Sequence, residues 1–128
     1  MPTLFVPKEI RAGERRVAAT PETVKKLIAA GFDVEVARAA GESAGITDHA
    51  YEAVGARIVA GVDPAGLAAD VILKVQPPTD AEAELPKSGA LLLALLDPYR
   101  NLELVRKLAA RGVAAFAMEL VPRTTRAQ

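Results

Sequence analysis

The chain has 128 residues, of which 51% are hydrophobic, and this is enough for one domain with its own buried core. Lysine plus arginine and aspartate plus glutamate number 16 each, so no overall positive field exists and nucleic acid is not expected as a partner. Cysteine is absent, which excludes disulfides, thiolate catalysis and cysteine metal sites and is ordinary for a reducing compartment. We therefore expect a cytoplasmic location.

The hydrophobic segments are too short to act in a membrane. Residues 1–7 form an apolar run without a basic region before it or a small-residue cleavage site after it, so a signal peptide is not expected. The longest apolar stretch, residues 90–96, is far below the roughly 20 residues of a spanning helix. We expect no direct membrane insertion, and any membrane association would come through partners.

Short apolar runs alternate along the chain with segments of helical spacing, and this alternation predicts stacked βαβ units. Residues 71–73 and 91–93 are continuously hydrophobic, which is typical of parallel strands covered on both faces. The prediction is an α/β fold with a parallel sheet and helices on both faces. Strands are expected near residues 4–6, 34–37, 57–59, 71–74, 90–95 and 114–118.

Two helices have clear boundaries in the sequence. Thr20 precedes Pro21 and is expected to cap the start of the first helix, and Gly31 is expected to end it in the left-handed conformation. Asn101 can cap the second helix, which Gly112 ends. The inward-facing residues are expected to be Val24, Leu27 and Ile28 in the first helix, and Leu102, Val105 and Leu108 or Ala109 in the second. Shorter helices are predicted over residues 48–54 and 80–85.

Three connections follow the carboxyl ends of predicted strands: residues 7–21, 75–79 and 122–128. The first has about fourteen residues, which is long for a strand-to-helix connection, and long loops in compact domains are more often functional. In open α/β sheets, ligands bind at the carboxyl edge of the strands. These loops are therefore the candidate site.

The first of these connections lacks the glycine-rich motif that brings a backbone close to a pyrophosphate. It holds one glycine, Gly13, beside Glu14, Arg15 and Arg16. Residues 41–45 and 61–66 have neither the spacing of that motif nor the features of a phosphate loop, and they are interpreted as turns. The sequence thus predicts a parallel sheet with no glycine-rich nucleotide loop of its own.

Among the polar residues, Arg16 and Lys74 are expected at the carboxyl edge, where each could present charge to an anionic ligand. For Lys74, pairing with Glu9 or Glu14, or reaching out to solvent, is an equally open alternative. His49 is the single histidine, has no second histidine for a metal site, and is expected on a surface helix without a role.

The terminal segment also carries cations. Arg123 and Arg126 could belong to a solvated tail, an alternative that the position near the terminus favours.

Ordered motifs along the whole chain resemble the alanine dehydrogenase and pyridine nucleotide transhydrogenase amino-terminal domain. The matching motifs are Pro7-Lys8-Glu9, Glu14-Arg15-Arg16-Val17-Ala18, Thr20-Pro21, Val24, Gly41 to Gly45, Asp48 with Tyr51, Gly55-Ala56, and Asp70 to Val75. The resemblance implies that residues 1–128 are the first segment of a larger, two-part NAD-binding unit with a Rossmann-like or flavodoxin-like fold.

Two branches of this superfamily separate in the second half of the chain. Alanine dehydrogenases carry a catalytic histidine just after the strand that matches residues 90–96, and here the sequence continues Leu95-Leu96-Asp97-Pro98-Tyr99-Arg100-Asn101 without one. The Pro98-Tyr99-x-Asn101 pattern and residues 118–128 resemble the NAD-binding domain of the proton-translocating NAD(P) transhydrogenase alpha subunit. This branch implies hydride transfer between NADH and NADP⁺, coupled to proton translocation.

The transhydrogenase resemblance implies a site in the terminal segment and no catalytic residue. Arg123 would orient the carboxamide or a nearby phosphate of NAD, Gln128 would hydrogen-bond the ribose or nicotinamide region, and Thr124 and Thr125 would line the site. Under the alanine dehydrogenase alternative, Arg16 and Lys74 would bind the substrate carboxylate; in a transhydrogenase they would be structural.

The same resemblance implies an assembly. Expected partners are the NADP-binding and membrane subunits of the transhydrogenase and a second copy of the chain in a homodimer, with a cytoplasmic location peripheral to the inner membrane. The family loop continues beyond the position of Gln128 and a glycine-rich fold follows it, so this chain alone is expected to be inactive. Two alternatives stay open: the amino-terminal domain of an alanine or saccharopine dehydrogenase, and a non-catalytic scaffold for subunit contact.

Overall fold

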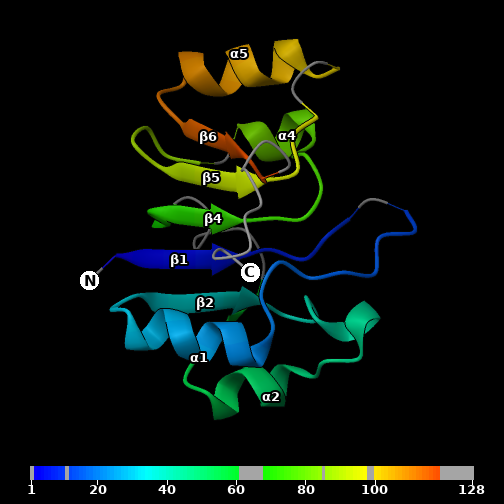
Figure 1. Ribbon diagram of the computed structural model, residues 1–128, viewed down its shortest axis with the longest axis vertical. Coiled ribbons are helices and arrows are strands. Elements are labelled where there is room, and N and C mark those ends of the chain that lie inside the picture. The colour runs from blue at the N-terminus through cyan, green and yellow to red at the C-terminus, as the bar shows by residue number, and fades with distance from the viewer. Residues whose placement is uncertain (1, 11, 61–67, 85, 98–99, 119–128) are drawn as a thin grey trace, which may run out of the picture.

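A parallel sheet organises the portion of the chain described by the computed structural model, which comprises residues 2–10, 12–60, 68–84, 86–97 and 100–118. Its six strands are ordered β3-β2-β1-β4-β5-β6, and all neighbours are parallel (Figure 1). The strands are β1 (Thr3–Val6), β2 (Asp33–Ala37), β3 (Arg57–Val59), β4 (Val71–Leu73), β5 (Leu91–Ala94) and β6 (Ala114–Ala117). The predicted α/β class and all six predicted strands are confirmed.

Helices lie against this sheet on opposite sides. In Figure 1, α1 lies in front of the sheet and α4 lies behind it. The described helices are α1 (Pro21–Ala29), α2 (Asp48–Ala53), α4 (Asp80–Ala83) and α5 (Leu102–Ala110), with a short 3₁₀ turn η1 (Glu42–Ala44). Within the described ranges, no helix combines the length and the apolar character needed to cross a bilayer.

Helix α1 forms as its sequence predicts. The Thr20 hydroxyl accepts a hydrogen bond from the Thr23 amide at 3.3 Å, and Pro21 occupies the first turn, where its missing N–H is not needed. Val24 is fully buried, and Gly31 ends the helix with a φ of 106°. Local capping and one apolar stripe are thus sufficient to define this helix.

Helix α5 presents a different face to the core from the one predicted. Leu104 and Leu108, one turn apart, are its buried residues, whereas Leu102 is 52% exposed and Ala109 is exposed. The inward position predicted for Leu102 is therefore wrong, that of Leu108, given as an alternative to Ala109, is confirmed, and Val105 is half-buried. Leu104 and Leu108 lie four residues apart on one side of α5 and pack as a continuous ridge, so they determine which face of the helix is buried.

The predicted cap of α5 is also wrong. The Asn101 side chain does not bond to the first turn of the helix; its amide nitrogen donates to the carbonyl oxygens of Leu96 at 2.8 Å and Asp97 at 3.2 Å. Asn101 therefore stabilises the preceding segment, which leaves β5, rather than the helix that it begins. Gly112 ends the helix as expected, with a φ of 77°.

Burial decreases from the centre of the sheet towards β6. In β1, Leu4, Phe5 and Val6 are each exposed by 2% or less, whereas Phe116 on β6 is 57% exposed and Met118, just beyond it, is 45% exposed. The predicted sheet with helices on both faces is confirmed, and within the described residues β6 is more exposed than β1.

The strand order places a topological switch point between β1 and β4. From β1 the chain moves outward through β2 to β3, and it then returns beside β1 to continue through β4, β5 and β6 in the other direction. Connections therefore diverge from the carboxyl ends of β1 and β4, which leaves a crevice between them. This crevice is where an open α/β sheet binds its ligand.

Candidate functional site

A hollow of about 290 Å³ lies at this switch point, formed by the loop after β1 and the carboxyl ends of β4 and β5. Its walls are mainly apolar, with two cations among them. The lining residues are Arg16, Val17, Ala18, Leu73, Lys74, Val75, Leu93, Leu95 and Met118. The structure thus brings together Arg16 and Lys74, the two cations that the sequence placed at this edge.

A buried carboxylate, Glu9, joins the loop after β1 to the end of β4. Its side chain is 3% exposed and accepts hydrogen bonds from Lys74 Nζ at 3.1 Å and from the backbone amides of Val75 at 2.9 Å and Gln76 at 3.0 Å. A buried carboxylate needs such donors because desolvation of an unpaired charge is costly. Glu9 therefore fixes the path of both segments at the mouth of the hollow.

Lys74 is a buried ion-pair residue. Its side chain is 4% exposed and pairs with Glu9 at 3.1 Å and with Glu82 of α4 at 3.5 Å. Of the alternatives for Lys74, pairing with Glu9 is confirmed, whereas Glu14 is not its partner and the side chain does not reach out to solvent. Two carboxylates surround this one ammonium group, so its charge is neutralised within the protein.

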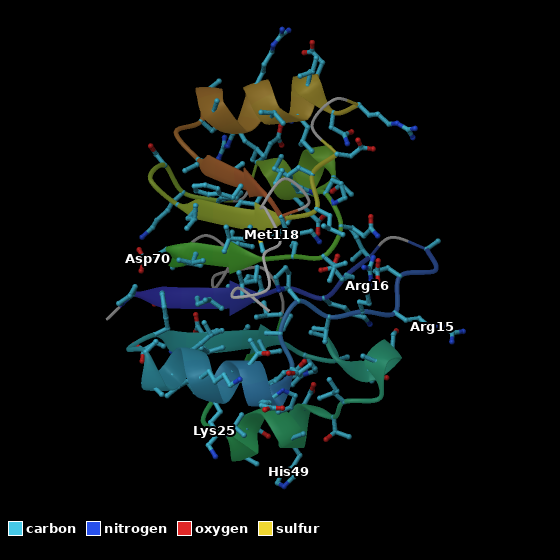
Figure 2. The ribbon with its side chains drawn as sticks, in the orientation of Figure 1. Arg15, Arg16, Lys25, His49, Asp70 and Met118 are labelled. Atoms are coloured by element: carbon cyan, nitrogen blue, oxygen red, sulfur yellow. The ribbon has the colours of Figure 1, made fainter. Side chains whose placement is uncertain are left out.

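A second carboxylate, Glu14, orients Arg16. Both oxygens of Glu14 accept from the guanidinium, from Nε at 3.0 Å and from Nη2 at 2.9 Å, and the Arg16 amide donates at 2.7 Å. The side chain of Gln76 donates to the same carboxylate. This bidentate pairing leaves the other guanidinium N–H groups directed away from Glu14, and the Arg16 side chain is 62% exposed at the hollow (Figure 2).

These donors hold the pKa of Glu14 at about 2, well below its usual 4.5. The hydrogen bond from the Arg16 side chain contributes most, followed by those from Gln76 and from the Arg16 amide. The same pairing raises the pKa of Arg16. Arg16 and Glu14 are therefore both charged at neutral pH, and the guanidinium keeps a fixed orientation.

Because the folded-state pKa of Glu14 is lowered, its contribution to stability is fully present above pH 4.5 and is lost as the pH falls towards about 2. We predict that the melting temperature of the wild type exceeds that of Glu14→Gln at about pH 5, and that the difference closes as the pH approaches about 2. Thermal unfolding followed by circular dichroism checks this, with Glu103→Gln, a 92% exposed side chain, as the control. A difference between wild type and Glu14→Gln that does not change with pH would contradict it.

The far end of the loop is anchored by Tyr51 of α2. The buried phenol donates to the carbonyl oxygen of Ala19 at 2.7 Å, and burial raises the pKa of Tyr51, with the charge of Asp48 as a second cause. A side chain at Gly41 would come within 2.9 Å of the Tyr51 ring, so glycine leaves the room that the ring occupies. Glu9, Glu14 and Tyr51 together hold the long loop against the body of the domain.

The other predicted site residues lie elsewhere. Arg123, Thr124, Thr125 and Gln128 lie outside the described residues, as does the turn predicted over residues 61–66. His49 is exposed on α2, whose first turn is capped by the Thr47 hydroxyl, and it does not line the hollow. The described ranges contain no group of three or more histidine, cysteine or acidic residues that could hold a metal ion.

Sequence reasoning missed the roles of Gln76 and Glu82 and the backbone contacts of Glu9. The one available signal was chemical: a lysine that interrupts an apolar strand requires a carboxylate, and Glu9 and Glu14 are the candidates at the same edge. The contacts of Lys74 with Glu9 and of Gln76 with Glu14 each join segments that are more than 60 residues apart in the sequence.

The described residues that line the hollow can bind a ligand and orient it. It has an apolar wall, one oriented guanidinium and one neutralised ammonium, and no histidine or hydroxyl nucleophile beside a base. Such a set can hold a planar or partly apolar group and contact its polar end.

Comparisons with known proteins identify the family of the chain. The chain matches the family "Alanine dehydrogenase/PNT, N-terminal domain" over residues 5–128. It is 47% identical to an NAD(P) transhydrogenase subunit alpha polypeptide of Rhodospirillum rubrum over 98% of this chain and 34% of that protein. Alanine dehydrogenase 1 of Staphylococcus aureus is 36% identical over 96% of this chain and 32% of its own length.

Solved structures show the same similarity. The transhydrogenase from Sinorhizobium meliloti superposes with a TM-score of 0.92 at 46% identity, over 98% of this chain and 37% of that one. An L-alanine dehydrogenase superposes with a TM-score of 0.84 at 33% identity, over 90% of this chain and 32% of that one. The chain therefore spans about a third of the length of these relatives.

Strand order and parallel pairing define a doubly wound α/β domain, and the hollow lies at the carboxyl edge of its sheet. The chain belongs to the alanine dehydrogenase/PNT N-terminal domain family.

Proposed function

We propose that this chain is the first segment of the NAD(H)-binding component of a proton-translocating NAD(P) transhydrogenase, in which hydride passes between NADH and NADP⁺. The carrying observation is that the described lining of the hollow contains no histidine: the single histidine of residues 1–128, His49, lies on α2 and does not line the hollow, and residues 95–128 after β5 contain none. Reduction of a keto acid needs a proton donor beside the carbonyl, whereas hydride exchange between two nicotinamides does not. The higher identity to the Rhodospirillum rubrum transhydrogenase subunit supports the same choice.

Bound NAD(H) would supply the hydride, and the protein would hold and orient it. In this proposal Arg123 orients the carboxamide or a nearby phosphate, Gln128 hydrogen-bonds the ribose or nicotinamide region, and Thr124 and Thr125 line the site. No protein nucleophile takes part, because hydride transfer requires two rings held face to face at close range. Arg16 and Lys74 are structural here: each is engaged by a carboxylate, Arg16 by Glu14 and Lys74 by Glu9.

The described residues fit one end of such a dinucleotide. Leu73, Leu93 and Leu95 give the hollow an apolar wall suited to the face of a ring. The connection after β1 has a single glycine and cannot cradle a pyrophosphate closely. We therefore propose that the phosphates are held by a second, glycine-rich portion of a two-part NAD-binding unit, to which residues 1–128 contribute the first segment.

The assembly follows from the same proposal. The chain would act with NADP-binding and membrane subunits, as a homodimer on the cytoplasmic side of the inner membrane. Its relatives are named as subunits of NAD(P) transhydrogenase, which supports the need for partner subunits.

The alternative is the amino-terminal domain of an alanine dehydrogenase, favoured by the meeting of Arg16 and Lys74 in one hollow. Assaying the full-length gene product separates the two functions. We expect hydride transfer from NADH to an NADP⁺ analogue in the presence of the partner subunits, and no amination of pyruvate. Pyruvate amination without transhydrogenation would contradict the proposal.

A separate titration tests the proposal that the NAD-binding site has two parts. Titration of this 128-residue chain with NADH, followed by nucleotide fluorescence, should show no binding in the roughly micromolar range typical of enzyme–substrate affinity. Tight binding by the chain alone would contradict the need for a second, glycine-rich portion.

A further inference from the structure

A second hollow, of about 440 Å³, lies at the amino ends of β2 and β3, at the edge of the sheet opposite the switch-point hollow (Figure 1). It shares no lining residue with that hollow, and its volume lies in the range of small-molecule sites. The proposed transhydrogenase function makes no use of it. The lining residues are Ile28, Phe32, Asp33, Val34, Gly55 and Arg57.

Apolar side chains and a glycine form one part of this hollow. Ile28 lies in the last turn of α1, and Phe32 follows the glycine that ends this helix. Gly55, which follows α2, has a φ of 104°, and a side chain there would come within 3.1 Å of Ile28 Cδ1. Glycine at this position therefore leaves room against Ile28 for the apolar part of a ligand.

Two opposite charges line the same hollow, on the first residues of neighbouring strands. Glu35 of β2 is in register with Arg57 of β3, and Asp33, two residues before Glu35, shares its face of the sheet. Arg57 Nη2 lies 3.2 Å from Glu35 Oε2, and the Arg57 side chain is 69% exposed. That contact uses one of the five N–H groups of the guanidinium. The exposed carboxylate of Asp33 has no hydrogen bond or ion pair with the part of the chain that the structure describes.

We propose that this hollow binds a small zwitterion with an apolar body, an α-amino acid with an aliphatic side chain. Its ammonium group pairs with Asp33, its carboxylate accepts from Arg57, and its side chain packs on Ile28 and Phe32. An ion of one sign is repelled by one of the two charged residues, and an apolar molecule covers both charges without pairing them. A zwitterion pairs with each of them. This inference does not depend on the transhydrogenase function.

The test is a titration of the full-length protein with L-leucine, followed by saturation-transfer NMR of the ligand. We expect saturable binding in the roughly millimolar range, as is typical of a ligand of this size. Two analogues each lack one charge: isoamylamine has no carboxylate, and 4-methylpentanoate has no ammonium group. Each should bind at least about tenfold more weakly than leucine, because each leaves one charged residue of the hollow without its partner.

Two single variants assign the charges to their residues. Asp33→Asn and Arg57→Gln should each raise the Kd for leucine about tenfold. Asp33→Asn should also abolish the preference for leucine over 4-methylpentanoate, and Arg57→Gln the preference over isoamylamine. The matched controls are Glu22→Gln and Lys25→Gln on the exposed face of α1, which remove the same charges outside the hollow and should leave the Kd unchanged.

Three outcomes would overturn the proposal. Wild-type protein that shows no saturable binding of leucine has no such site. Leucine binding that neither Asp33→Asn nor Arg57→Gln weakens lies outside this hollow. Equal affinity for leucine and isoamylamine in the wild type removes Arg57 from the site, and a zwitterion is then not the ligand. Melting temperatures of the variants without ligand, equal to that of the wild type, show that the measured losses are losses of binding.

Discussion

Replacing Glu9 with alanine should lower the free energy of unfolding by about 3 kcal/mol, one of the largest single-residue effects at the switch point. The substitution leaves Lys74 buried with only Glu82, at 3.5 Å, and removes the acceptor of the Val75 and Gln76 amides. Thermal unfolding should show a decrease in melting temperature of about 10 °C. Glu9→Gln keeps an oxygen acceptor and should lose less.

Glu103→Ala is the matched control for this prediction. It also removes an ion-paired glutamate, but the Glu103 side chain is 92% exposed and its 3.4 Å pair with Arg106 lies on the surface of α5. Surface pairs of this kind contribute little to stability. Equal destabilisation by the two variants would show that the buried contacts of Glu9 do not hold the loop.

The largest effect on activity is expected in the terminal segment. In the full-length protein, Gln128→Ala should reduce the rate of hydride transfer about 10²-fold, because a misplacement of about 1 Å at the reacting rings has an effect of that size. The KM for NADH should change much less, since the phosphates are proposed to bind elsewhere. Arg123→Ala should affect both, because it would contact the carboxamide or a phosphate.

Arg126→Ala provides the comparison, since this residue belongs to the same segment and has no proposed role. Single-turnover measurements of hydride transfer separate the chemical step from product release. A normal single-turnover rate in Gln128→Ala would remove Gln128 from the proposed site. Equal losses in Arg126→Ala and Arg123→Ala would indicate a general effect of the segment's charge.

Features set by neighbouring residues could be predicted from the sequence. The continuous apolar run at residues 71–73 indicated β4, and Thr20 with Pro21 indicated the start of α1, because capping and burial act within a few residues. Asn101 shows the limit of this reasoning. It has the chemistry of a cap, but its side-chain amide bonds to the Leu96 and Asp97 carbonyls, and only the path of the chain after β5 decides between the two uses.

The candidate site could be located from the sequence but not assembled. In a parallel sheet the loops after the strands meet at one edge, where ligands bind. This rule correctly predicted that Arg16 and Lys74 lie at that edge. The pairing of Glu9 with Lys74 joins residues separated by 65 positions, and that of Gln76 with Glu14 by 62. Such pairs depend on which strand lies beside β1, and local patterns carry no information about strand order.

The central place of β1 also affects when the protein can fold. During synthesis β1 emerges before the other strands of the sheet and can pair with β2 once residues 33–37 are available, but its other edge pairs with β4, at residues 71 and 72. Until then the Glu9 carboxylate lacks the donors at residues 74–76, and the hollow lacks a wall. Such distant pairing slows folding, because the intervening chain must be ordered first. The ligand edge therefore forms only after more than half of the 128 residues have been made, when the two halves of the sheet join.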